Sequence, residues 1–340
     1  MFGKVSAVSA LAGLIDSFPW LTPKSSSIAN PAPFNDPSEA PIFDFSNTPL
    51  APDYPARKRY VKILDGVFTP EECNALVRFA ETGVFDPHGT TDVEMTGENP
   101  WKQAAIHFGM EEHQQLVDTK YRNSERILRF DEGVVQWLYE RLRPYVHELE
   151  EIVPESEWER VVGRPGGQQD WKMIGLNERL SFLRYGPGHF FKEHCDGQVS
   201  LPDGRQGRVT VQIYLGGDAE GGATRIWSRD MRRWLDVEPK IGRALVFQQR
   251  DVLHSGQPVV RGTKLTVRTD IMFRTSPHSI ATWWYHASIC MLLNLLGYPY
   301  CGLRSGYITY SSAPQVLMGH CAHTPIFTLA AQESTSESCH

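Results

Sequence analysis

The sequence is poor in cysteine, and the few cysteines are unevenly spread. Only Cys73 and Cys195 precede residue 290, and no Cys-x-x-Cys pair occurs. Two thiols over most of the chain argue against a disulfide framework. Without a Cys-x-x-Cys pair, the sequence also lacks the ligand spacing of a common type of zinc site. The composition therefore indicates a reducing compartment, and the cytoplasm is the favoured location.

An excess of positive charge is also lacking. The 340 residues include 34 Lys and Arg against 40 Asp and Glu, which gives a formal net charge of −6. A chain with this balance has no excess of basic residues to bind nucleic acid, so we expect no nucleic-acid partner. The hydrophobic share of 41% is ordinary for a globular protein, and the length allows a sizeable core.

Long apolar runs are scarce. The run from residue 5 to 15 lacks a clear cleavage site, which argues against a secretory signal. Residues 280–303 are apolar and long enough to span a bilayer, but His286, Asn294 and Pro299 weaken that interpretation. We expect this run to pack against a domain or to remain poorly ordered, with membrane association as the less favoured alternative.

Composition divides the chain into three parts. Residues 16–56 are rich in Pro, Ser and Asn, so we interpret residues 1–56 as a disordered leader or linker. Residues 57–277 form the predicted folded domain, and 278–340 an extension that is first apolar and then disordered.

Helix signals come first in the predicted domain. A strand is expected over 60–64, and Thr69, Pro70 and Glu72 form a start signal for a helix over 70–82. After a long loop over 83–105, which is either a substrate lid or simply solvated, a second helix is expected over 131–152. Pro144 should kink or divide that helix.

Short strands separated by turn residues follow a Gly-rich turn at 161–170. They are expected at 178–185, 190–194, 208–215, 223–227, 234–237, 243–248 and 264–273. Helices followed by antiparallel strands predict an α+β fold in which N-terminal helices flank a jelly roll.

Three residues suggest a metal centre. His194 and Asp196 lie two positions apart at the end of a predicted strand, so their side chains point the same way. His254 follows another strand across a turn. Two His and one carboxylate form a facial set that suits non-haem Fe(II). The His-x-Asp triplet alone is equally consistent with an ordinary hydrogen-bonded pair.

The strand over 264–273 alternates in character. Leu265, Val267, Thr269, Ile271 and Phe273 share one face, and Lys264, Thr266, Arg268 and Asp270 share the other. Lys264 or Arg268 could hold the distal carboxylate of a 2-oxo acid that chelates the metal. The alternative is that both cations face water.

The strand over 208–215 has a polar face formed by Thr210, Gln212 and Tyr214, which suits a ligand-holding barrel. Tyr214 and Tyr185 are candidates for contact with the co-substrate, although either could be structural. Two polar clusters upstream, 122–126 and 175–179, face either the substrate or the solvent, and capping and surface charge is the favoured interpretation.

Four motifs occur in order: YGPGHFFKEHCDG, QIYL, GGATRIW and VEPKIGRALVFQQRDVLHSGQPVVRGTK. Over residues 57–275 they resemble the prolyl 4-hydroxylase-like 2-oxoglutarate/Fe(II) dioxygenases, most specifically over 180–273. The resemblance implies a double-stranded β-helix (jelly roll) with flanking N-terminal helices. It also implies a set of site residues: iron ligands His194, Asp196 and His254, the 2-oxoglutarate anchor Lys264 with Arg268 as second candidate, pocket tyrosines Tyr185 and Tyr214, and a tight turn at Gly222.

The resemblance further implies Fe(II) as cofactor, 2-oxoglutarate and O2 as co-substrates, and ascorbate as an additional cofactor. The expected activity is hydroxylation of a C–H bond, first of all in a prolyl residue of a protein. The same chemistry on a small molecule, such as a free amino acid or a secondary metabolite, is the second hypothesis. A jelly roll that binds without catalysis is the third.

Overall fold

The computed structural model describes residues 24–27, 36–55, 59–88, 99–107, 115–163, 167–277, 302–304 and 307–309. The chain divides into two compact units, Met1–His278 and Ser279–His340. In the second unit, β21 (Gly302–Arg304) and β22 (Tyr307–Thr309) pair as an antiparallel hairpin. Most of the apolar run 280–303 lies outside the described residues. No helix in the described part of the chain has the length and apolar character needed to cross a bilayer.

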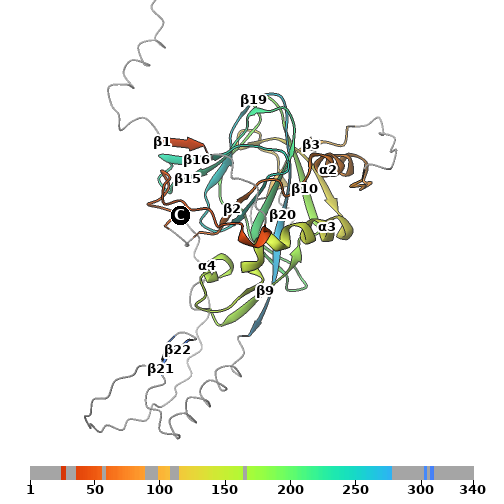
Figure 1. Cartoon of the computed structure of the whole chain (residues 1–340). Helices are drawn as coiled ribbons and strands as arrows, with labels where there is room; N and C mark the ends of the chain where they lie inside the picture. The colour runs from red at the N-terminus through yellow and green to blue at the C-terminus, as the bar shows by residue number, and fades with distance from the viewer. Residues whose placement is uncertain are drawn as a thin grey trace, which may run out of the picture. The chain divides into compact units, whose positions relative to one another are not determined.

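Two β-sheets form the body of the first unit (Figure 1). Within the described residues the larger sheet has the order β2 (Val61–Leu64), β17 (Ala244–Gln248), β13 (Gln206–Gly216), β20 (Lys264–Pro277), β10 (Arg179–Tyr185), β7 (Glu125–Phe130) and β3 (Lys102–Gln103). At its margins β12 (Val199–Ser200) pairs with β13, and β9 (Gln169–Leu176) pairs with β20 and β8 (Glu151–Ile152).

The smaller sheet completes the jelly roll. Its order is β1 (Lys24–Ser27), β16 (Arg233–Val237), β15 (Thr224–Trp227), β18 (His254–Gly256), β11 (Phe190–His194) and β6 (Arg122–Asn123). From β10 to β20 the chain passes repeatedly between the two sheets, and these core pairs are antiparallel. This is the winding of a double-stranded β-helix, so the predicted fold class is confirmed.

Short pairs and helices fill the remaining described segments. They are β4 (Ile106–His107) with β5 (Gln115–Leu116), β14 (Glu220–Gly221) with β19 (Val259–Arg261), the 3-10 helix η1 (Pro37–Glu39) and helix α4 (Glu159–Val162). The pair β14–β19 joins the turns that precede β15 and β20.

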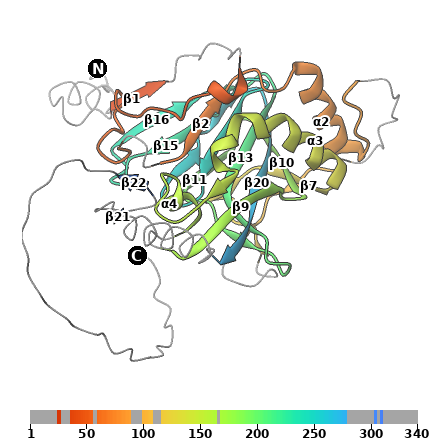
Figure 2. The ribbon, with the colours of Figure 1, turned by 60° about the horizontal axis from the view of Figure 1, so that its bottom comes forward.

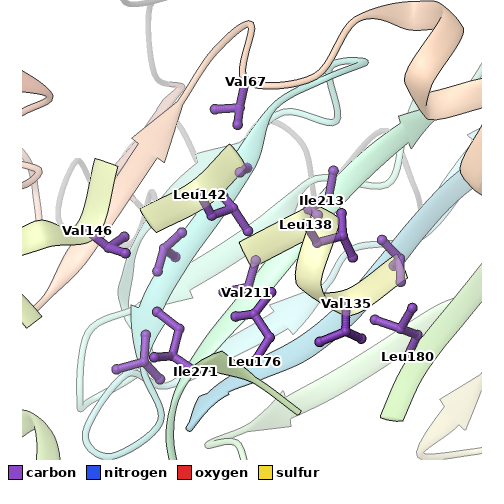
Figure 3. Packing of buried hydrophobic residues seen from close by; sticks show 14 of the residues in the cluster. Val67, Val135, Leu138, Leu142, Val146, Leu176, Leu180, Val211, Ile213 and Ile271 are labelled. Carbon is purple, nitrogen blue, oxygen red and sulfur yellow. The ribbon is translucent and has the colours of Figure 1, made fainter. Parts of the chain in front are cut away.

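Helices α2 (Pro70–Thr82) and α3 (Glu132–Leu142) cover one face of the larger sheet, as Figure 2 shows. Val135, Leu138 and Leu142 lie at helical spacing on one face of α3 and point toward Val211 and Ile213 of β13 (Figure 3). All five side chains are at most 5% exposed. We call this helix-covered side the outer face of the larger sheet, and the side toward the smaller sheet its inner face.

The two helix starts follow from local chemistry. Thr69 accepts a hydrogen bond from the backbone of Glu72 at 3.2 Å, and the Glu72 side chain accepts one from the Thr69 backbone at 2.9 Å. This capping box confirms the predicted start of α2. At α3, the Asp131 carboxylate accepts from Val134 at 2.8 Å.

The second predicted helix is divided near Pro144, as expected. After Leu142 the chain continues as the 3-10 helix η2 (Arg143–Leu149), in which Val146 leaves the helical region with φ −129°. The expectation that the helix extends to residue 152 is wrong, because Glu151 and Ile152 pair with β9 as strand β8.

Residues 36–55 correct the interpretation of 1–56 as a disordered leader. Phe45, Leu50 and Tyr54 are at most 3% exposed and join a second core between the sheets. The Tyr54 hydroxyl donates to the Trp227 carbonyl at 3.0 Å. The error arose because the Pro- and Ser-rich composition hid a few well-spaced apolar residues that the folded domain buries.

Three strands of the larger sheet, β3, β7 and β9, are not predicted from the sequence. β7 and β9 each overlap one end of a predicted polar cluster (122–126 and 175–179), and β3 falls in the expected loop. In β7, two arginines flank Ile127 and Leu128, so the sequence shows no regular polar/apolar alternation although the strand is half-buried.

Candidate metal centre

The three predicted metal ligands converge at one end of the jelly roll. His194 on β11 and His254 on β18 are direct partners of the antiparallel pair, and their ring centroids lie 4.3 Å apart. Asp196 follows two residues after His194. One ligand atom from each of the three residues lies within 4.8 Å of the other two. Residues that are 60 positions apart in the sequence therefore form one donor set.

Backbone carbonyls orient both imidazoles. His194 Nδ1 lies 2.7 Å from the Lys192 carbonyl, and His254 Nδ1 lies 3.1 Å from the Val252 carbonyl. Because each Nδ1–H donates to a carbonyl, each Nε2 keeps its lone pair for a metal. The two Nε2 atoms face the Asp196 carboxylate at 3.6 and 3.9 Å. Burial, followed by the interaction with the neighbouring His194, lowers the pKa of His254 to about 4, which keeps the His254 ring neutral.

Two neighbours hold the Asp196 carboxylate. Thr210 of β13 donates to Oδ2 at 2.6 Å, and Arg268 Nε of β20 lies 3.3 Å from the same oxygen. Burial alone would raise the pKa of Asp196, but the charge of Arg268 and the nearby His194 hold it well below the ordinary value. The carboxylate is therefore ionised and presented as a metal ligand.

Arg268 is already paired. Besides Asp196, its guanidinium contacts Asp270 at 3.1 Å, and Gln249 donates to that same Asp270 oxygen at 2.8 Å. The second candidate for the 2-oxoglutarate anchor is thus neutralised by two carboxylates, which leaves it poorly suited to attract a third.

Lys264 lies in a different environment. Its side chain is 2% exposed, Nζ donates to the Gly222 carbonyl at 2.7 Å, and the ammonium lies 4.3 Å from the centroid of the Tyr185 ring. Within the described part of the chain it has no carboxylate partner, and burial lowers its pKa to about 8. A buried ammonium without a counter-charge is costly, so this cradle fits an anion.

A neighbouring hydroxyl strengthens the fit to 2-oxoglutarate. Thr266, two positions after Lys264 on the inner face, is 2% exposed, and its Oγ1 is buried without a partner among the described residues. An orphaned donor beside an unpaired cation suits a carboxylate. A Cβ on Gly256 would lie 3.9 Å from Lys264 Nζ, and Gly256 is two positions from His254, or roughly 7 Å along the strand. A five-carbon diacid can bridge that span.

The two predicted tyrosines lie in different surroundings. Tyr185 forms the aromatic wall beneath Lys264. The Tyr214 hydroxyl donates to Thr224 at 2.7 Å, and Gln212 donates to the same Thr224 oxygen at 2.9 Å. Tyr214 is therefore part of a polar network between the sheets, while its ring packs in the second core.

The predicted tight turn at Gly222 has a steric reason. Its φ is +72°, and a Cβ there would lie 2.9 Å from Val259 and 3.4 Å from the Lys264 side chain. Only glycine satisfies both demands at this turn, which places the carbonyl that accepts from Lys264.

Several site residues were not assigned a role from the sequence. Strand alternation had put Thr210, Thr266 and Asp270 on the polar face, but it could not say which groups they meet. For Arg122 the favoured interpretation as surface charge is wrong. Its side chain is 8% exposed, and its guanidinium lies 4.6 Å from the centroid of Phe191.

One comparison, with protein-family models, agrees with this chemistry. Residues 180–271 match the family model of the 2OG-Fe(II) oxygenase superfamily. No curated protein sequence matches the chain.

Among solved structures, the viral collagen prolyl hydroxylase vCPH of Paramecium bursaria Chlorella virus-1 is 19% identical, with 63% of this chain and 96% of that chain covered and a TM-score of 0.38. A Pseudomonas putida prolyl-4-hydroxylase is 18% identical, with 65% and 96% covered and a TM-score of 0.39. A Trichoplax adhaerens prolyl hydroxylase, solved with a peptide of hypoxia inducible factor, is 15% identical, with 67% and 89% covered and a TM-score of 0.40.

The matched segment runs from β10 to β20 and contains all three donor residues, the lone cation Lys264 and the orphaned hydroxyl of Thr266. Two imidazoles and one carboxylate suit Fe(II), and the Lys264 cradle suits the distal carboxylate of 2-oxoglutarate. Residues 180–271 thus form a 2-oxoglutarate- and Fe(II)-dependent oxygenase domain of the 2OG-Fe(II) oxygenase superfamily.

Proposed function

We propose that this protein hydroxylates a prolyl residue in a protein substrate. The single observation that carries the proposal is Lys264, a buried ammonium ten positions after His254 that has no acidic partner among the residues the structure describes. A lysine at this spacing, with the motif YGPGHFFKEHCDG before it, is the pattern that resembles the prolyl 4-hydroxylase-like enzymes.

Each residue of the site then has a defined task. Lys264 and Thr266 hold the distal carboxylate of 2-oxoglutarate, while Thr210 and Arg268 fix the Asp196 carboxylate. When bound, iron and 2-oxoglutarate supply the oxidising chemistry: 2-oxoglutarate is decarboxylated to succinate and CO2, one oxygen atom of O2 enters succinate, and the other enters the substrate C–H bond. Phe191 stacks on His194 with ring centroids 3.8 Å apart and shields that ligand from water on one side.

The cofactor chemistry is tested by an anaerobic titration of the apoprotein with Fe(II) and 2-oxoglutarate. We expect a metal-to-ligand charge-transfer band in the wild type and in His147→Ala, a control at a half-exposed histidine on η2. The band should vanish in His194→Ala. Absence of the band in the wild type would overturn the dioxygenase assignment.

The substrate class is tested by mass spectrometry. The loaded enzyme is incubated with a library of proline-containing peptides and, separately, with a small-molecule extract, and products heavier by one oxygen atom are sought. A modified prolyl peptide whose product requires 2-oxoglutarate supports the proposal. Products found only in the extract would replace it with the small-molecule hypothesis.

A further inference from the structure

An arginine beside the metal centre lacks an acidic partner in the part of the chain that the structure describes. Arg122 on β6 is 8% exposed, and within the described residues its guanidinium makes one hydrogen bond, from Nε to Ser124 Oγ at 3.1 Å. It stacks on Phe191, which in turn stacks on the ligand His194. A cation that is nine-tenths buried without a carboxylate is costly unless a ligand supplies one.

A second arginine lies four residues further on. Arg126 on β7 is the register partner of Leu183 on β10, and Leu183 is also the partner of Thr266 on β20. Opposite residues of antiparallel strands share a face, so Arg126 belongs to the inner face that carries Thr266. The hydrogen bond that its guanidinium makes in the described part of the chain goes to the Ala105 carbonyl at 3.3 Å, and no carboxylate pairs with it.

Arg122 and Arg126 lie on consecutive strands at the margins of the two sheets. β6 is the last strand of the smaller sheet and β7 lies near the margin of the larger sheet, with the fully buried Ser124 between them. Arg126 is affected by this crowding: burial, followed by repulsion from Arg122 and Arg179, lowers its pKa to about 10. These like charges lie at the edge of a site whose own carboxylates, Asp196 and Asp270, are already paired with Arg268.

We propose that Arg122 and Arg126 bind a carboxylate of the substrate, so that the enzyme selects a prolyl residue with an aspartate or glutamate close to it in the sequence. The inference rests on the proposed function and specifies its substrate class. A guanidinium pair can grip a carboxylate with several charge-assisted hydrogen bonds, whereas an amide of the same shape offers only one acceptor and no charge. One aromatic ring separates Arg122 from His194, so the acid would bind next to the reacting centre.

The test uses two pools of labelled peptides that differ only in having Asp or Glu, or else Asn or Gln, around a central proline. Binding to the full chain is measured by fluorescence anisotropy with 2-oxoglutarate and without O2, and hydroxylation of the same pools is measured by mass spectrometry. We expect the acidic pool to bind at least about tenfold more tightly to the wild type.

Variants assign that preference to the two arginines. Arg126→Gln should bring the acid-to-amide ratio close to one, Arg126→Glu should favour a third pool with Lys around the proline, and Arg122→Lys should keep most of the preference. Arg232→Gln, at an exposed arginine in the turn between β15 and β16, is the matched control and should leave the ratio unchanged.

Each outcome separates this inference from the proposed function. Equal binding and equal hydroxylation of the acidic and amide pools would overturn the inference and leave prolyl hydroxylation standing. Preferential binding of the acidic pool without hydroxylation would leave the arginine site standing and overturn the proposed function. A preference that survives Arg126→Gln and Arg126→Glu unchanged would also overturn the assignment to this pair.

Discussion

On β13 and β20, the outer and inner faces of the larger sheet carry opposite kinds of side chain, although the same strands form both. On β13, Val209, Val211 and Ile213 pack under the helices, while Thr210 and Gln212 point between the sheets. The outer face supplies apolar burial and the inner face supplies polar contacts to the metal centre. One strand therefore contributes to stability through one set of residues and to chemistry through the alternating set.

The difference shows how a jelly roll can hold a reactive site without losing its core. Removing a buried apolar residue from the outer face should lower the free energy of unfolding and leave the site intact. Changing an inner residue should impair binding first. Substitutions on the two faces therefore test whether stability and binding are separable in this way.

The largest effect is expected for Asp196→Ala. Loss of one of three ligands should weaken Fe(II) binding by more than about 100-fold, since losing only an outer hydrogen-bond partner of a ligand already costs roughly 10–100-fold. Metal content after dialysis against Fe(II) and the yield of succinate measure this. Asp203→Ala, at a half-exposed aspartate paired with Arg205, is the control and should bind iron normally.

The second largest effect is expected for the loss of a buried apolar side chain from the outer face. Ile213→Ala should lower the free energy of unfolding by about 2–5 kcal/mol, because Ile213 is fully buried beneath α3. Denaturant unfolding measures the loss. The affinity of the folded protein for 2-oxoglutarate should stay within about twofold of the wild type. A large loss of that affinity would show that the two faces are coupled.

On the inner face, Lys264→Ala should raise the 2-oxoglutarate requirement by about 10–100-fold, the value of one charge-assisted contact of about 1.5–3 kcal/mol. Arg268→Ala should change this requirement far less, because its guanidinium serves Asp196 and Asp270. Its main effect should be on folding and iron binding. Titrations of 2-oxoglutarate at saturating iron decide the order, and the reverse order would move the anchor to Arg268.

The smallest effect is a pH dependence of 2-oxoglutarate binding. Burial lowers the pKa of Lys264 to about 8, so the free protein loses this positive charge above that pH. Affinity should fall by up to about tenfold per pH unit above 8. The folding contribution has the opposite sign: because the pKa is lower in the folded state, the stability cost of burying this group lessens as pH rises from about 8 to 10.5.

Lys264→Arg separates this effect from other titrations. An arginine stays charged throughout this range, so its 2-oxoglutarate affinity should be nearly flat between pH 7 and 9.5. The same slope in the variant and the wild type would assign the pH dependence to another group.

Much of the site followed from local patterns. The alternation of β20 placed Lys264, Thr266 and Arg268 on one face, and the His194–Asp196 spacing put both side chains on one side of a strand. These patterns repeat every two residues, so they can be recognised in a short segment of sequence without knowledge of the rest of the fold. Similarly, the capping residues of α2 act within one helical turn.

Other features depend on distant partners and left no such pattern. The burial of Phe45 and Leu50 requires a core between two sheets, and composition alone suggested a disordered leader. The polar segment around Arg122 and Arg126 looks like surface charge until β6 and β7 pair with β11 and β10. Which strands pair with each other depends on the path of the whole chain, so a short segment of sequence does not reveal it.

The amino-acid sequence alone indicates the chemical groups of the site: two imidazoles, a carboxylate and two cations at spacings typical of an iron and 2-oxoglutarate pocket. Which of the two cations is left unpaired depends on the tertiary fold. Arg268 pairs with Asp196 and Asp270, whereas Lys264 is buried against Gly222 and Tyr185 with no acid beside it among the described residues. Strand alternation gives Lys264 and Arg268 the same face. Asp196, one of the two carboxylates that pair with Arg268, follows β11 of the other sheet, so this pairing forms only when the two sheets come together.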